Sequence, residues 1–334
     1  MNNQEQFKLT FDEAKKKLMA MTLINNFLWN SANENEEDAK TIASIILSNV
    51  LDSKVEVLDV TIQKEFAGAD TIYHGIRMDA HINRSKVNNK LTATVYDIEM
   101  EDREADRIGL PRRLRFYSAL PDSKELPSSE DYQNMPDFIS VVILSYDPFL
   151  IGDMYYEAKM HLSTHPDYDY NDGRTFILLY ANGKPNFEDE AYGKKVQELL
   201  KYIVSGEFTT QNDDIKVLDE IVTKVKSKTE VTRSLMKQWD REMSIRREIR
   251  AEVTAEVTAE VTNKVTEEVT NKVTAAKDRE AAIRQIKLSR KYGASDEQIL
   301  KDLKESYSYD DDMLDKLFGE AGKKDNREDI PNGK

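Results

Sequence analysis

Acidic residues occupy every second position of one short stretch of the chain, VYDIEMED, residues 95–102. Asp97, Glu99 and Glu101 alternate there with apolar residues. Successive side chains of a strand point to opposite faces, so this alternation predicts a strand with one acidic and one apolar face. Like charges that share a face of a strand repel one another. The acidic face therefore needs a cation or another positively charged partner.

A second stretch, GIRMDAHI at residues 75–82, places Asp79 between apolar neighbours in the same alternating pattern. The polar, Asn-rich sequence NRSKVNN separates the two stretches. This arrangement predicts a β-hairpin with arms at residues 72–82 and 91–101. If the arms pair, Asp79 joins the acids of the second arm on one face, and the apolar residues of both arms form a buried face.

Two interpretations explain so many carboxylates on one face. A hard divalent cation, Mg²⁺ or Mn²⁺, binds two or three carboxylates together with water and a substrate phosphate. Alternatively, the face is exposed to solvent, and Arg77, Arg112 or Arg113 neutralises the acids without a metal. His81 lies on the same face and is expected to be an exposed histidine of the hairpin, with a role beside the acids as the alternative.

Helix and strand patterns around the hairpin predict the elements that position it. Apolar residues at helical spacing in SANENEEDAKTIASIILSNVLD indicate a helix. The following stretch, VEVLDVTIQKEFAG, is expected to be a strand that ends in a loop at Gly68. A helix is expected to begin at Pro111 and to end at Pro121. Three further strand patterns and a helix at 188–205 follow, with Gly206 just past that helix. The mixed order predicts one α/β domain over residues 21–206.

The chain changes character beyond residue 206. Residues 211–277 are charged, contain no Gly or Pro, and include valine at every fourth position from Val253 to Val273. The pattern predicts one long helix, on which such a stripe drifts by about 40° per repeat. The helix is either solvated or self-associates as a coiled coil, which would make the protein a homo-oligomer. A helix over 1–20, a helical hairpin over 278–322 and a disordered tail over 323–334 complete the expected organisation.

Bulk composition excludes several classes of site. The chain has 334 residues, no cysteine and a formal net charge of −14. Thiol catalysis and cysteine metal sites are therefore excluded. The charge argues against nucleic acid binding over the whole surface but allows a local basic groove. The polar start and the absence of a 20-residue apolar run predict a cytoplasmic protein with no membrane partner.

The stretches GIRMDAHI, VYDIEMED, LPRRLRFYSALP and MPDFISVVILSYDPF together resemble the recombination-promoting nuclease and transposase family of the PD-(D/E)XK superfamily. The resemblance covers approximately residues 20–206, and the repetitive, charged C-terminal region is also similar. It implies a restriction-endonuclease-like α/β core, with a mixed sheet flanked by helices, followed by a long helical extension. The implied activity is a metal-dependent DNA endonuclease that promotes recombination or acts with a mobile element.

The resemblance also implies roles for particular residues. Asp79 and Glu99 correspond to the acids that bind catalytic Mg²⁺ or Mn²⁺, and Glu37, or its neighbour Glu36, is the candidate for a third acid from the first helix. Arg113 and Tyr117, four residues apart, match an Arg/Tyr pair that would contact the phosphate or orient the acids.

Glu101 is the largest departure from the family pattern, because related proteins have Lys or Gln at this position. A glutamate supplies no positive charge, although it could act as a base or as a further metal ligand. The alternative function is therefore a catalytically weakened nuclease-fold module that binds DNA or protein and oligomerises through its C-terminal helices.

Overall fold

The computed structural model describes residues 8–66, 76–126, 129–209 and 211–322. The chain divides into two compact units, Met1–Glu242 and Met243–Lys334. The expected loop at Gly68 and the expected tail over 323–334 lie outside the described residues. In the described part of the chain, no helix is both long enough and apolar enough to cross a membrane.

The first unit contains one mixed β-sheet, with strand order β1-β2-β4-β5-β7-β6 and β3 paired to β2. β4, β5 and β7 are parallel to one another, and the other pairings are antiparallel. The strands are β1 (Val55–Phe66), β2 (Ile76–Val87), β3 (Lys90–Thr92), β4 (Val95–Glu101), β5 (Phe138–Leu144), β6 (Tyr155–Ala158) and β7 (Arg174–Tyr180). The fold is therefore α/β, as the sequence predicts.

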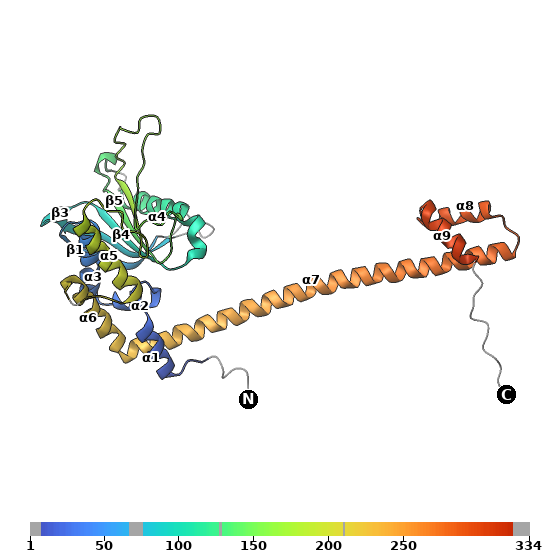
Figure 1. Cartoon of the computed structure of the whole chain (residues 1–334), viewed down its shortest axis with the longest axis horizontal. Helices are drawn as coiled ribbons and strands as arrows, with labels where there is room; N and C mark the ends of the chain where they lie inside the picture. The colour runs from blue at the N-terminus through green and yellow to red at the C-terminus, as the bar shows by residue number, and fades with distance from the viewer. Residues whose placement is uncertain (1–7, 67–75, 127–128, 210, 323–334) are drawn as a thin grey trace. The chain divides into compact units, whose positions relative to one another are not determined.

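Helices cover both faces of this sheet (Figure 1). Those of the first unit are α1 (Phe11–Ala20), α2 (Asn26–Ala32), α3 (Glu36–Val50), α4 (Leu110–Glu125), α5 (Glu190–Ser205) and α6 (Asp213–Ser227). The apolar stripes of α3, α5 and α6 pack on one face in the main core. α4 packs on the opposite face through Leu110 and Leu114, and a 3₁₀ helix, η2 (Glu104–Gly109), leads into it.

Two helix boundaries differ from the sequence prediction. α4 does not end at Pro121 but continues to Glu125. Because proline lacks an amide hydrogen, the helix loses only the bond that residue 121 would donate to the carbonyl of Tyr117, and the helix continues for one more turn. The single helix expected from residue 211 is two helices, since α6 ends at Ser227 and α7 (Thr229–Lys291) begins after it.

The compact first unit extends beyond the expected end of the α/β domain at residue 206. Apolar residues of α6 and of the first turns of α7 belong to the main core, including Leu218, Val222 and Leu235. α1 is also attached, because Lys15 Nζ donates to the carbonyl oxygen of Lys226 at 2.6 Å and Leu18 is buried. α1, α6 and the start of α7 are thus parts of the unit that carries the acidic strands.

The second unit contains the rest of α7, α8 (Asp296–Ser306) and α9 (Asp311–Ala321). Ile286, Ile299, Leu303, Leu314 and Leu317 form its small core. The helical pattern expected over 278–322 therefore includes the end of α7 as well as two shorter helices.

The acidic hairpin is longer and more buried than the alternation of residues predicts. β2 extends to Val87, and the turn to β3 contains Asn88 and Asn89, both with positive φ. β4 is covered on both faces, because α4 lies over the side that carries the acids. His81 is correspondingly buried and packs edge-on against the Phe66 ring, so the expectation of an exposed histidine is wrong.

Candidate functional site

The site lies where the hydrogen-bonded ladder between β2 and β4 stops. Backbone pairing joins Ile82 to Tyr96, His81 to Asp97 and Ala80 to Ile98, and it does not continue to Asp79 and Glu99. Beyond Ala80 and Ile98, hydrogen bonds from the side-chain carboxylates of Asp79 and Glu99 take the place of backbone pairing.

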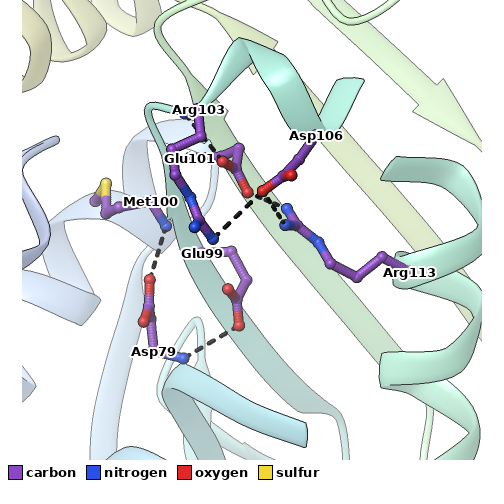
Figure 2. Close-up of polar contacts among 7 residues, drawn as sticks. All are labelled: Asp79, Glu99, Met100, Glu101, Arg103, Asp106 and Arg113. Atoms are coloured by element: carbon purple, nitrogen blue, oxygen red, sulfur yellow. Dashed lines mark hydrogen bonds and ion pairs between the residues drawn. The ribbon is translucent and has the colours of Figure 1, made fainter. Parts of the chain in front are cut away.

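Glu99 Oε1 accepts a hydrogen bond from the amide of Asp79 at 3.1 Å, and Asp79 Oδ2 accepts one from the amide of Met100 at 3.1 Å (Figure 2). Each of the two carboxylates, Asp79 and Glu99, is therefore hydrogen-bonded to a backbone amide of the neighbouring strand.

Gln63 of β1 holds the other oxygen of the Asp79 carboxylate. Its Nε2 donates to Asp79 Oδ1 at 2.9 Å and to Asn30 Oδ1 of α2 at 3.0 Å. Gln63 has a φ of 53°, in the left-handed region that is unfavourable for a residue with a Cβ atom. The ladder between β1 and β2 includes Ile62 with Ala80 and Lys64 with Met78 but skips Gln63. A distorted strand thus directs an amide donor at the aspartate.

Glu101 contacts Arg113 of α4 through an ion pair between Oε2 and Nη2 (Figure 2). The other Glu101 oxygen accepts a hydrogen bond from the amide of Arg103 at 3.1 Å, and Asp106 Oδ2 lies 3.6 Å from Arg113 Nη1. The buried Nε of Arg113 has no hydrogen-bond partner. Glu101 therefore fixes the guanidinium beside the other two acids, and the arginine retains one donor without a partner.

Tyr117 and Asp97 complete the surroundings of Glu99. The Arg113 guanidinium carbon lies 5.9 Å from the centre of the Tyr117 ring. Burial raises the pKa of Tyr117, and the negative charge of Glu99 raises it further, so the phenol stays protonated and can donate a hydrogen bond. Asp97 is fully buried, and its Oδ2 accepts a hydrogen bond from Ser140 Oγ at 3.0 Å.

Burial and mutual repulsion raise the pKa values of three of these carboxyl groups. Burial is the largest cause for Asp79, Asp97 and Glu99. The Asp79 charge also raises the pKa of Asp97, which reaches about 8, while the charges of Asp97 and Asp79 both raise the pKa of Glu99. Hydrogen bonds from Met100 and Gln63 act in the opposite direction on Asp79. Without a cation, the three groups thus resist simultaneous ionisation.

Asp79 and Glu99, but not Asp97, line an open cavity of about 880 Å³. Its lining also includes residues of α2 and of the first turns of α7, such as Asn30, Gln238 and Trp239. The charged residues that line it are Glu34, Asp79, Glu99, Glu101, Asp102, Glu242, Arg77, Arg103 and Arg113. Because acids outnumber arginines, a phosphate group that enters the cavity meets net negative charge unless a cation is bound there.

The predicted site residues fall into two groups. Asp79, Glu99, Glu101, Arg113 and Tyr117 all line the cavity.

Glu37 does not join them, because it lies in the first turn of α3 with its side chain 82% exposed and bonded to Lys40. Glu36 likewise pairs with Lys40. The upstream acid that does line the cavity is Glu34, which precedes α3.

A divalent cation fits the site by ligand chemistry. The carboxylate oxygens of Asp79 and Glu99 are the hard donors that Mg²⁺ and Mn²⁺ prefer, and burial together with neighbouring acids raises the pKa values of both groups. Within the described ranges, no three or more His, Cys, Asp or Glu side chains converge as a preformed metal site. The carboxylate oxygens of Asp79 and Glu99 are therefore suitable ligands for a divalent cation. One oxygen of each carboxylate already accepts a hydrogen bond from a backbone amide.

Sequence reasoning missed Gln63, Asn30 and Arg103. Gln63 could have been found from strand pairing, since its place in VTIQKEF lies opposite Asp79 once β1 is aligned with β2. No local pattern indicates Asn30, which reaches the site only through packing of α2 in the first unit. Comparison of the chain with protein-family models, with curated proteins and with solved structures gives no match.

Proposed function

We propose that the protein is a metal-dependent DNA endonuclease of the PD-(D/E)XK type, which acts in recombination or with a mobile element. The observation that carries the proposal is the juxtaposition of Asp79 and Glu99. They lie on adjacent strands where the backbone ladder stops, beside a fixed arginine, in an open cavity. The sequence resemblance supports the same assignment.

In this proposal Asp79 and Glu99 hold Mg²⁺ or Mn²⁺. The bound ion would polarise the scissile phosphate and lower the pKa of a water molecule. Gln63 keeps Asp79 oriented and favours its ionised form. Arg113, held by Glu101 and lining the cavity, would stabilise the negative charge that develops on the phosphate through its guanidinium charge. Tyr117, whose phenol stays protonated, is a neutral hydrogen-bond donor that lines the same cavity.

The test is a plasmid-nicking assay with Mg²⁺, with Mn²⁺ and with EDTA. Asp79→Asn and Glu99→Gln are expected to lower the cleavage rate at least 100-fold, because each removes a charged ligand while it preserves the shape of the side chain. Glu157→Gln, on the exposed part of β6, is the matched control and should cleave at the wild-type rate. Metal-dependent cleavage that persists in both site variants would contradict the assignment.

A second function is favoured by the Glu101–Arg113 ion pair. The pair neutralises the arginine nearest to Glu99, which is consistent with a nuclease-fold module that binds DNA or a protein without cutting. If wild type does not cleave DNA with any divalent metal but binds DNA in the presence of Ca²⁺, this function replaces the first. If Glu101→Gln, which releases Arg113, then acquires metal-dependent cleavage, the ion pair is the reason for the loss.

A further inference from the structure

A run of arginines lies directly after the acidic strand. Residues 103–115 contain five arginines and two acids, although the whole chain carries a net charge of −14. The run forms η2 and the first turns of α4. It is therefore a locally basic surface on an acidic protein.

Only part of this charge is used by contacts within the protein. Arg113 pairs with Glu101 and Asp106, and Arg103 pairs with Asp106 at 3.3 Å while its side chain stays 77% exposed. Arg107 and Arg112 make no ion pair with any described residue. Arg112 is exposed on the side of α4 away from buried Leu110 and Leu114. These arginines keep their charge available to a partner.

The most exposed large apolar side chain among the described residues lies within this run. Ile108 is 89% exposed and is preceded by Arg107, whereas Leu110, two residues later, is fully buried. An apolar side chain this exposed makes no contribution to the core. Next to Arg107, it fits a partner that combines phosphates with apolar groups. Nucleic acid is such a partner, because deoxyribose and base edges lie between its phosphates.

The run also leads into the cavity of the site. Arg103 lines that cavity, and Arg113 connects the start of α4 to Glu101. A phosphate chain that follows the exposed arginines is therefore led to Arg103 and Arg113, which line the same cavity as the carboxylates. This continuity favours nucleic acid over an acidic protein, whose charges are not spaced along a continuous backbone.

We propose that η2 and the start of α4 form a duplex DNA-binding surface, in which Arg103, Arg107 and Arg112 contact backbone phosphates and Ile108 contacts sugar or base edges in the minor groove. The inference rests on the proposed function for its ligand class, but it concerns binding and not cleavage. It specifies which surface holds the duplex while one strand lies at Asp79 and Glu99.

The test measures binding of a fluorescently labelled DNA duplex to the full chain, by anisotropy with Ca²⁺ and with EDTA over a series of salt concentrations. The double variant Arg107→Gln, Arg112→Gln should bind on the order of tenfold more weakly at physiological salt. The slope of log K against log salt should fall in magnitude by about 2, since each lost phosphate contact removes about 0.9. Ile108→Ala should weaken binding and leave the slope unchanged.

The matched control is Arg246→Gln, Arg250→Gln, which removes the same charge from exposed positions in the second unit. It should bind DNA with the wild-type affinity and slope. The proposal would be overturned if both double variants lost the same affinity, or if the variant Arg107→Gln, Arg112→Gln bound DNA like wild type. It would also be overturned if wild type bound no duplex, or if it bound polyglutamate as tightly as DNA.

Two outcomes separate this inference from the proposed function. If the basic surface binds duplex but no metal supports cleavage, the nuclease assignment fails and the binding surface stands. If wild type cleaves normally and loss of Arg107 and Arg112 changes nothing, the surface is wrong and the nuclease assignment stands.

Discussion

At the scale of single residues, the site is a balance between carboxylates that repel each other and the few donors that hold them. Asp97 is the most buried of these acids and contacts Ser140, while Glu101 has an arginine partner. The alternation in residues 95–102 thus gives three acids of one strand different surroundings. Asp97 is a neighbour of the site, Glu99 a candidate ligand, and Glu101 the residue that fixes Arg113.

The buried carboxyl group of Asp97 predicts a pH-dependent stability. Its pKa in the folded protein is raised from an ordinary value of 3.8 to about 8, so the folded state binds the proton more tightly than the unfolded state does. Its contribution to stability is therefore complete below pH 4 and is lost as the pH rises towards 8 and beyond. Asp97→Asn, which can still accept from Ser140, should remove this dependence.

Thermal unfolding in EDTA should show the effect. The melting temperature of Asp97→Asn is expected to exceed that of wild type at pH 8.5 by several degrees more than at pH 5. Asp167→Asn, a change of the same kind at an exposed position, provides the comparison and should show no such difference between the two pH values. Parallel melting curves for Asp97→Asn and wild type across this range would contradict the prediction.

At the scale of elements, distortion of two strands opens the site. β1 contains Gln63 in the left-handed region, and β2 is not paired with β4 on the N-terminal side of Ala80. A regular ladder would have engaged the amides of Asp79 and Met100 with backbone carbonyls. Because the strands part, side-chain carboxylates accept from these amides and face the cavity.

Gln63→Gly tests whether this distortion serves the site. Glycine adopts positive φ without a Cβ clash, so the free energy of unfolding should stay within about 1 kcal/mol of wild type or increase. Cleavage should nevertheless fall about tenfold, because Asp79 loses the Nε2 donor. Loss of that donor also raises the pKa of Asp79, so the acidic limb of the pH–rate profile should move to higher pH.

Asn89→Gly relieves the same kind of backbone conformation, at a φ of 66°, in the turn between β2 and β3. It should gain stability like Gln63→Gly but cleave with the wild-type rate and pH profile. Wild-type kinetics in Gln63→Gly would show that Gln63 contributes only to structure.

The strands and most of the site could be predicted from sequence because their signals are local. Period-two alternation locates β2 and β4, and it brings Asp79 and Glu99 together once these strands pair. The layer above the acids could not be predicted, since nothing in residues 95–102 indicates that α4 covers them. The exposed position of Glu37, outside the cavity lining, could not be predicted for a similar reason: a residue in the first turn of a helix faces solvent or the site according to how that helix packs.

At the scale of the whole molecule, the repeats of α7 extend further than valine alone shows. Eight β-branched residues recur at intervals of four, and all are about half exposed: Ile245, Ile249, Val253, Val257, Val261, Val265, Val269 and Val273. All belong to the second unit, whose small core begins only near the end of α7. Within the described part of that unit, the stripe is therefore not covered by another segment of the chain.

We expect this stripe to support self-association. A step of four residues advances 400° on a helix, so the stripe rotates by about 40° per repeat and leaves a straight partner after about two repeats. Continuous contact therefore requires a right-handed wrap of helices that carry the same period, and a second copy of the chain provides such a helix.

The triple variant Val257→Thr, Val261→Thr, Val265→Thr should keep the helix and lower the molar mass measured by light scattering, because threonine has the shape of valine but a polar hydroxyl group. Thr258→Ser, Thr262→Ser, Thr266→Ser changes neighbouring positions as mildly and should retain the wild-type mass. A monomeric wild type at high concentration would instead show that the isolated helix is fully solvated. Its glutamates and lysines, such as the Glu260–Lys264 pair, would then have to stabilise the helix without a partner, against the low helix propensity of valine and threonine.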